Sequence, residues 1–557
     1  MTTSPQGIPD LPPQFSIKST GAPNGLISPA WRGFLLLSTL IIALAFCLRI
    51  YHLSQRSLWL DEAIAANISR GTLAQTLTLT RGLHSAPILD PMVLYAVEKV
   101  GDGPLAVRLP SLVASLLAVM LMLCFAAIPS VGTRAAALSA LMLSVSAAQI
   151  RYAQEVREYS FSVLYAGVLL YAFLAYLSGG KRRGAPIPFL LVLFVAPFIQ
   201  YGLVLFSGSI LAALLIVDFT GAERGRRFGH ILIASAFLAL GCLLSYLLTL
   251  RYQWEGSAWY LKDYYWSPGS NLLRFFGTNT HYLFTSFLLP GLGAALISVA
   301  AMLLYLTLAV RRRSLSPLAV LAFTSFGTVL AFSLLHLYPY GPVRQCLFLA
   351  PVMCLFAATC LVEISERFAG RANVLVFAAM AGLVVLSGAL QIRSLKPYAE
   401  VEDMQQVLQF LHGHMEPGDN VFVYPGAVPA VDFYLKQRDP RFLYSDYHQQ
   451  EPEKYAVEMQ AGLAPGTRRA WILFCHIFRQ EDQRILGDLG ADWNVAPALS
   501  VKGCALYLAS SRAPVAELGT ASAGSGVTSK TGAKSLADAT HETFWEWNLH
   551  NARPSIR

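Results

Sequence analysis

Residues 33–63 read GFLLLSTLIIALAFCLRIYHLSQRSLWLDEA, an apolar run followed closely by two adjacent carboxylates. The apolar part, 33–50, approaches the length of about 20 residues that a helix needs to cross the hydrocarbon core of a bilayer. Asp61 and Glu62 then stand just beyond the membrane, where a carboxylate removed from water must be compensated by an ion pair, a metal ion or a function. This stretch predicts a membrane protein with chemistry at one surface.

The composition agrees with a membrane location. The chain has 557 residues, of which 55% are hydrophobic and only 13% are charged, so a soluble fold would have too much apolar surface to hide. The net charge of +9 comes in part from short basic clusters between apolar runs, which is typical of cytoplasmic loops rather than of a nucleic-acid-binding surface. These clusters are Lys181-Arg182-Arg183, Arg224 with Arg226-Arg227, and Arg311-Arg312-Arg313.

Hydropathy predicts a polytopic α-helical membrane protein with about eleven spans. The apolar stretches are 33–50, 105–128, 133–149, 160–178, 186–201, 203–218, 229–250, 284–309, 317–337, 345–363 and 373–392. With a cytoplasmic N-terminus and a first span that is retained as a signal anchor, the basic clusters fall inside. The segments expected outside are 51–104, 150–159, 251–283, 338–344 and everything after about residue 393.

The periodicity changes near residue 400. A helical face formed by Val401, Met404, Leu408 and Leu411 precedes alternating strand and helix patterns, which indicate a small periplasmic α/β domain. The patterns are a strand at Asn420–Tyr424, a helix at Val431–Lys436, a strand at Ala470–Cys475, a helix at Glu481–Leu489 and a strand at Cys504–Ala509. Cys475 and Cys504 fit either a disulfide or two buried thiols. The predicted parts are a cytoplasmic segment 1–32, a transmembrane domain 33–392, the α/β domain 393–511 and a disordered tail 512–557.

A second charged stretch, RYAQEVREY at 151–159, joins two apolar segments on the predicted outer side. It can be a solvated hairpin tip or part of a site. If it is helical, Arg151 pairs with Glu155 and Gln154 pairs with Glu158, each four residues apart. The carboxylates of Asp61 and Glu62 point in different directions in any regular structure, so they have separate tasks. Asp61 can also serve as the N-cap of a helix that begins near Glu62.

These stretches together resemble the successive landmarks of the bacterial glycosyltransferase family 39, membrane enzymes of the GT-C fold similar to protein O-mannosyltransferases and to the lipid A aminoarabinose transferase. The landmarks are Leu58-Trp59-Leu60-Asp61-Glu62-Ala63, His84 and Pro87 ahead of Leu94-Tyr95, Val107-Arg108-Leu109-Pro110-Ser111, Tyr152-Ala153-Gln154-Glu155-Val156-Arg157 and Tyr340-Gly341-Pro342-Val343-Arg344. One departure is His84-Ser85-Ala86-Pro87, where relatives often read His-x-Pro-Pro.

The resemblance implies transfer of a sugar from a polyprenyl-phosphate donor to an acceptor hydroxyl, with inversion. Asp61 matches the family's acidic residue in the first outer loop and Glu155 the one in the second. Such a donor has a good leaving group, so the protein must activate the acceptor and stabilise the phosphate charge. Arg157 and Arg344 are candidates for the phosphate because a guanidinium offers two parallel donors. The remaining substrate-binding candidates are Glu62, His84 and Tyr152.

Several alternatives stay open. No compact ligand motif predicts a metal site, although a divalent cation held by Asp61, Glu155 and His84 fits the chemistry. A secondary transporter or a membrane assembly protein for lipid-linked glycans would also use many spans, but transporters place ionisable residues near the midplane. The expected location is the plasma (inner) membrane of a bacterium, with the site on the periplasmic face, membrane lipids as partners and no nucleic acid. The acceptor can be a lipid, a glycan or a protein.

Overall fold

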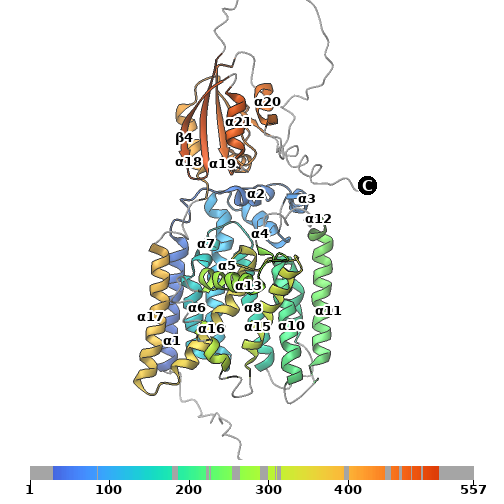
Figure 1. Ribbon diagram of the computed structural model, residues 1–557, viewed down its shortest axis with the longest axis vertical. Helices are drawn as coiled ribbons and strands as arrows, with labels where there is room; N and C mark the ends of the chain where they lie inside the picture. The colour runs from blue at the N-terminus through green and yellow to red at the C-terminus, as the bar shows by residue number, and fades with distance from the viewer. Residues whose placement is uncertain are drawn as a thin grey trace, which may run out of the picture.

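The protein is described by a computed structural model (Figure 1). The residues that the structure describes are 29–83, 86–178, 186–220, 225, 227–253, 264–288, 299–300, 302–307, 309, 315–393, 401–445, 453–462, 467–477, 480–490 and 493–512. The predicted cytoplasmic segment lies almost wholly outside these residues, and the predicted disordered tail lies outside them beyond its first residue, 512. His84 and most of the three basic clusters also lie outside them.

Long helices form a bundle, and most of the shorter helices lie at one end of it, whereas α13 (Leu272–Leu283) lies lower, across the bundle (Figure 1). The long helices are α1 (Pro29–Ile50), α5 (Pro104–Cys124), α6 (Gly132–Val145), α8 (Tyr159–Ser178), α9 (Ile187–Ile199), α10 (Gly202–Thr220), α11 (Phe228–Ser245), α15 (Pro317–Leu334), α16 (Ala350–Ser365) and α17 (Arg371–Arg393). The shorter ones are α2 (Leu60–Ile68), α3 (Leu73–Leu83), α4 (Leu89–Glu98), α7 (Ala147–Ala153), α12 (Arg251–Gln253) and α13 (Leu272–Leu283). Short 3-10 or π-helical pieces are η1 (Phe125–Ala127), η2 (Tyr246–Leu250), η4 (Phe284–Leu288) and η5 (Arg344–Leu349).

The helices confirm a polytopic membrane protein. Within the described residues, 8 helices are long and apolar enough to cross a bilayer, or up to 9 if α6 and α7 form one broken span. Each predicted span coincides with a helix except 284–309, which lies largely outside the described residues. The predicted span 186–201 corresponds to α9, which at 13 residues is shorter than the ~20 that a straight crossing needs.

Arg49 stabilises the break between α6 and α7, which meet at an angle of 63°. Its fully buried guanidinium donates to the carbonyl oxygens of Leu143 (3.1 Å) and Ser144 (2.9 Å), at the end of α6. The last carbonyls of a helix lack partners within the helix and carry partial negative charge, so a cation there is favourable. The bend turns α7 and the charged stretch that follows it across the end of the bundle.

Parts of three of the segments predicted to lie on one side of the membrane, 51–104, 150–159 and 251–283, come together at one end of the bundle. The Gln154 amide donates to the carbonyl oxygens of Arg49 (2.8 Å) and Tyr51 (2.6 Å), which joins the second charged stretch to the end of α1. The Gln253 amide donates to the carbonyl of Thr80 at 2.9 Å, which joins α12 to α3. Figure 1 shows α2, α3 and α4 between the bundle and the C-terminal domain.

The C-terminal domain is a mixed five-stranded sheet in the order β2-β1-β3-β5-β4. Strands β1 and β2 and strands β1 and β3 are parallel, whereas β5 is antiparallel to both β3 and β4. The strands are β1 (Asn420–Val423), β2 (Phe442–Tyr444), β3 (Arg469–Cys475), β4 (Trp493–Val501) and β5 (Cys504–Ser511), and the helices are α18 (Met404–His414), α19 (Val428–Leu435), α20 (Glu453–Gly462) and α21 (Glu481–Leu489). The predicted α/β domain is therefore confirmed, although β2, β4 and α20 were not predicted.

The two cysteines of this domain form a disulfide. Cys475 at the end of β3 lies directly opposite Cys504 at the start of β5, and the bond links them. Of the two alternatives that the sequence left open, the structure therefore has the disulfide.

The sheet domain shares a hydrophobic core with the covering helices. One buried cluster contains Leu58, Ala63 and Val156 from the membrane domain together with Met404 and Val428 from the C-terminal domain. Helices α2 and α19 pack against each other at this junction. The packing buries apolar surface from both parts, which is the main favourable term in holding them together.

Candidate active site

Asp61 lies in the first turn of α2, close to the junction of the two domains. The helix begins at Leu60, and its N-cap is Trp59, whose side chain makes no capping hydrogen bond. The N-cap alternative for Asp61 is therefore wrong, because the helix starts two residues earlier than that alternative requires. The Asp61 side chain is 21% exposed, so its carboxylate can be reached from outside the protein.

Two arginines from distant segments surround Asp61. Arg344 in η5 places its Nη1 atom 2.7 Å from Asp61 Oδ2, and Arg157 places Nη1 3.8 Å from the same oxygen. Burial pushes the pKa of Asp61 upward, but the charges of Arg157 and Arg344 outweigh it, so the pKa is lowered. The carboxylate is therefore ionised at neutral pH.

Aromatic rings hold the Arg344 side chain. Its guanidinium carbon lies 5.5 Å from the ring centre of Trp59 and 5.6 Å from that of Tyr159. Both distances fall within the range in which a cation is attracted by the ring face. Arg344 is 23% exposed, whereas Arg157 is only 5% exposed. Of the two guanidinium groups, that of Arg344 is the more open to a ligand.

Glu62, next in sequence, has different surroundings. It is fully buried, and its oxygens accept hydrogen bonds from Arg108 Nε (3.0 Å) and Nη2 (2.8 Å) and from the backbone N–H of Val156 (2.9 Å). The structure therefore separates the two adjacent carboxylates, as expected from their opposite directions. These contacts tie α2 to α5 and to the second charged stretch.

Arg108 completes this network and was given no role by the sequence analysis. Its Nη1 donates to the carbonyls of Leu53 (3.0 Å) and Arg56 (2.8 Å), and its Nη2 donates to that of Ser57 (3.0 Å). These bonds fix the segment that leads from α1 to Asp61. A charge inside an apolar span was the available signal, since such residues almost always have a partner.

The second charged stretch is only partly helical. Helix α7 ends at Ala153, and the expected pair forms between Arg151 Nε and Glu155 Oε1 at 2.9 Å. The expected pair of Gln154 with Glu158 is wrong, because the chain leaves the helix and Gln154 turns toward α1. Glu158 instead lies 3.2 Å from Arg157 Nε.

Glu155 is almost completely buried, with 1% of its surface exposed. Its Oε2 atom has no hydrogen-bond partner among the described residues. Burial raises the pKa of Glu155, and the positive charge of Arg151 only partly opposes this. The residue lies inside the protein near Arg151, Glu62 and Arg56 rather than at the surface.

The other predicted site residues have mixed placements. Tyr152 packs edge-on against Tyr159 with ring centres 5.3 Å apart. Tyr159 also contacts Arg344, so Tyr152 lies near that arginine. His84 is outside the described residues. Among the residues that the structure describes, no group of three or more His, Cys, Asp or Glu side chains comes together to hold a metal ion.

Two residues of the C-terminal domain also approach the site and were missed by the sequence analysis. The ring of His476 lies 6.3 Å from that of Trp59, and Glu402 accepts a hydrogen bond from the backbone N–H of Leu60 at 2.9 Å. Neither residue belongs to a local motif, so no signal within its own segment could have identified it.

The helix bundle with a sheet domain at one end shares its fold with solved glycosyltransferases of the GT-C class. No protein family and no curated protein matches the chain in sequence. Among solved structures, ArnT from Cupriavidus metallidurans bound to undecaprenyl phosphate is similar, with 13% identity, a TM-score of 0.53 and coverage of 86% of this chain and 98% of that chain. The oligosaccharyltransferase of Archaeoglobus fulgidus has 11% identity, a TM-score of 0.53 and coverage of 83% and 73%. These likenesses establish the GT-C fold.

Proposed function

We propose that this protein is a membrane glycosyltransferase that moves a sugar from a polyprenyl-phosphate donor to an acceptor hydroxyl, with Asp61 as the general base. The observation that carries the proposal is the pairing of a partly exposed carboxylate with the guanidinium of Arg344 at 2.7 Å. A base for the acceptor and a cation for the leaving phosphate are the two groups that the reaction needs side by side. The fold supports the same class of reaction, since ArnT was solved with undecaprenyl phosphate.

In the proposed reaction the acceptor oxygen attacks the anomeric carbon while the bond from that carbon to the phosphate oxygen breaks. The hydroxyl proton passes to Asp61, and the electron pair of the broken bond leaves with the polyprenyl phosphate. One direct displacement inverts the anomeric centre. Arg344 stabilises the charge that develops on the phosphate, which is the transition-state interaction that accelerates the chemistry.

Donor binding changes the surroundings of the base in this scheme. Without donor, Arg344 pairs with Asp61 and lowers its pKa, which weakens it as a base. A donor phosphate competes for the same guanidinium, and a bound phosphate weakens the hold of Arg344 on the carboxylate. The pKa of Asp61 then rises, so the base becomes effective when the donor is in place.

The remaining residues receive supporting roles in the proposal. Arg157 holds Asp61 in place, since its guanidinium lies close to the carboxylates of Asp61 and Glu158. Glu155 and Tyr152 are proposed to orient the sugar or the acceptor, and Glu62 to position α2 through Arg108. The oligosaccharyltransferase of Archaeoglobus fulgidus was also solved with Zn and sulfate, but no step of this proposal is assigned to a metal ion.

Other parts of the proposal concern location and substrates. In this proposal the transmembrane domain spans 33–392 and the α/β domain spans 393–511. The site and the sheet domain lie on the periplasmic face of a bacterial inner membrane. The transferred group is a hexosyl or pentosyl residue, as expected for the family 39 resemblance, and the acceptor is a lipid, a glycan or a protein.

The test is a transfer assay. Purified protein is incubated with radiolabelled polyprenyl-phosphate sugars and a membrane extract as the acceptor, wild type beside Asp61→Asn. Transfer by the wild type that is lost in the variant supports both the reaction and the base. If folded wild-type protein transfers no lipid-linked sugar, the proposal fails and a transporter or an assembly protein becomes the better interpretation.

A further inference from the structure

The stretch that enters the C-terminal domain, residues 401–403, passes across the N-terminus of α2. The backbone N–H of Leu60 donates to Glu402 Oε2 at 2.9 Å, and Glu402 is only 2% exposed. The first amides of a helix have no acceptor within the helix, and Trp59 supplies no side-chain cap. A carboxylate from another domain therefore provides an acceptor for the helix that carries Asp61, and its charge suits the positive end of the helix dipole.

The same carboxylate binds His476. Its Oε1 atom lies 2.6 Å from His476 Nδ1, so one oxygen of Glu402 contacts α2 and the other contacts the imidazole. His476 follows β3 with a left-handed backbone, at φ 50°, next to the disulfide between Cys475 and Cys504. The disulfide and a hydrogen bond from the His476 N–H to the Gly503 carbonyl at 3.3 Å fix this residue at the edge of the sheet.

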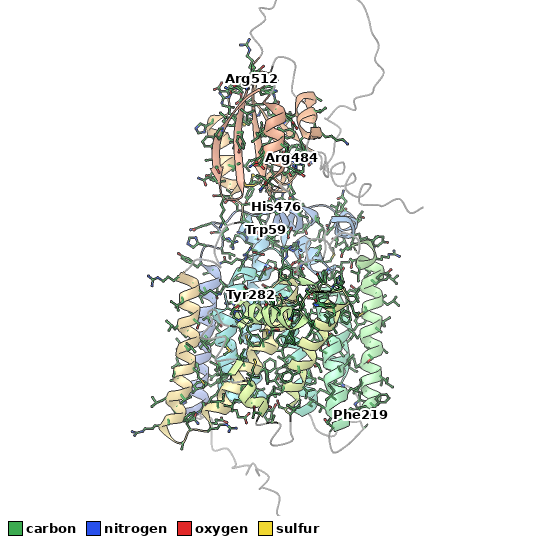
Figure 2. The ribbon with its side chains drawn as sticks, in the orientation of Figure 1. Trp59, Phe219, Tyr282, His476, Arg484 and Arg512 are labelled. Atoms are coloured by element: carbon green, nitrogen blue, oxygen red, sulfur yellow. A yellow bond between two sulfur atoms is a disulfide. The ribbon has the colours of Figure 1, made fainter. Side chains whose placement is uncertain are left out.

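The imidazole faces the candidate active site. Figure 2 shows His476 and Trp59 near each other at the junction of the sheet domain and the helices, and their ring centres are 6.3 Å apart. Trp59 also lies near the guanidinium of Arg344, at 5.5 Å. His476 is close enough to Asp61 to contribute to its electrostatic surroundings. A chain of contacts therefore leads from Glu402 through His476 and Trp59 to Arg344.

Further contacts hold the short segment that leads into α2. Ser57 Oγ donates to Asp403 Oδ1 at 3.0 Å and accepts from the backbone N–H of Gln405 at 3.1 Å. The backbone N–H of Leu58 donates to the hydroxyl of Tyr434 at 2.8 Å. The C-terminal domain thus binds the residues shortly before Asp61. A domain that only covered the site would not need these contacts.

From these contacts we infer that Glu402 and His476 form a positioning pair, through which the C-terminal domain holds the first turn of α2 and Trp59 so that Asp61 and Arg344 stay aligned. The inference rests on the proposed function for its catalytic consequence. It adds a role for the C-terminal domain, which becomes part of the active-site framework and not only a docking module for the acceptor.

The experiment compares three variants with the wild type in full-length protein. Glu402→Ala removes both hydrogen bonds. Glu402→Gln keeps an acceptor for the Leu60 N–H and offers an amide N–H to His476 Nδ1, so it serves as the conservative rescue. Glu481→Ala is the matched control, because Glu481 is a buried carboxylate of the same domain that accepts a bond from Tyr424 (2.7 Å) within that domain.

The first readout is hydrogen exchange at the amides of α2, which requires no turnover. Glu402→Ala should speed exchange at Leu60 and its helical neighbours, Glu402→Gln should restore protection, and Glu481→Ala should leave α2 as in the wild type. Unchanged protection of α2 in Glu402→Ala would overturn the inference, whether or not the wild type transfers sugar. Lost protection in that variant supports the positioning contact even if no lipid-linked sugar is transferred, so failure of the proposed function is recognised separately.

The second readout is the kinetics of sugar transfer. Misplacing a catalytic group by about 1 Å can cost about 100-fold in rate, so Glu402→Ala should lower kcat on the order of tenfold to 100-fold, with a smaller change in the KM for the donor. Glu402→Gln should recover most of kcat. A kcat per folded molecule that is unchanged in Glu402→Ala, or equally reduced in Glu481→Ala, would show that the pair only stabilises the domain.

Discussion

The substitution Asp61→Asn should have two opposite effects, because Asp61 is proposed to be both the base and the partner of the phosphate-binding arginine. Loss of a general base costs about 100-fold to 10,000-fold in rate, so transfer should fall by at least that range. Binding of polyprenyl phosphate should instead become tighter, since Arg344 no longer has to leave a carboxylate and the negative charge facing the phosphate is gone.

The gain in affinity can be worked out from the ion pair. The nitrogen and oxygen are 2.7 Å apart, and the side chains are 23% and 21% exposed. Exposed pairs contribute up to about 1 kcal/mol, whereas breaking a buried pair costs about 3–5 kcal/mol. The pair of Asp61 and Arg344 is mostly but not fully buried, so the free energy of breaking it lies near the lower of these values, at about 1.4 kcal/mol. Removing this cost should lower the Kd for polyprenyl phosphate about tenfold.

The assay is titration of the purified protein with polyprenyl phosphate, monitored by tryptophan fluorescence because Trp59 contacts Arg344. The matched control is Asp102→Asn, which removes another carboxylate of the same predicted outer segment, one that is paired with Lys436 and is half exposed. The control should leave both affinity and turnover unchanged. Weaker binding in Asp61→Asn would refute the competition between Asp61 and phosphate, and wild-type turnover would refute its role as the base.

Three further outcomes are expected. Because the arginines lower the pKa of Asp61, the proposed base should stay ionised as the pH falls until that lowered pKa is reached. Arg344→Gln should therefore move the acid limb of the kcat/KM profile to higher pH. An unmoved limb would show that Arg344 does not set the pKa of the base. Glu62→Ala should lower the free energy of unfolding by about 3–5 kcal/mol, since it leaves the buried Arg108 without its carboxylate. Replacing both Glu62 and Arg108 by Leu should cost less. Thermal unfolding in detergent checks this, and a smaller loss of stability in Glu62→Ala than in the double variant would contradict it. Gly503→Ala should destabilise the sheet domain, because φ is +71° and a Cβ there would collide with the carbonyl oxygen of Val401. A near-UV circular dichroism signal that is lost at the wild-type unfolding temperature would contradict this.

The membrane architecture could be predicted from the sequence because its signal is local. A run such as 203–218 is apolar apart from two serines and Asp218 at its end, and burial in lipid follows from composition alone. The C-terminal domain was predicted less completely. Strand β4 contains Pro497, next to an irregularity in its pairing with β5, and proline makes a run look unlike a strand. Both β4 and β2 are edge strands of the sheet, where the hydrophobic pattern is weakest.

The candidate site was predicted only where a resemblance supplied the residues. Asp61 and Arg344 are far apart in the sequence, and no pattern within either segment shows that their side chains meet. The adjacent carboxylates Asp61 and Glu62 look equivalent in sequence, although one is partly exposed and the other is completely buried. Only the packing of α2 against α5 and the C-terminal domain distinguishes them, and packing of this kind depends on the whole fold.

The disulfide between Cys475 and Cys504 bears on the order in which the protein matures. Such bonds form and persist in oxidising compartments and are rare where thiols are kept reduced. The bond lies one residue before His476, so in the proposed periplasmic location the part of the sheet that reaches the candidate active site is closed only after the C-terminal domain has crossed the membrane. In that topology, a protein whose helices have inserted would lack this closure until its C-terminal domain reached the oxidising side.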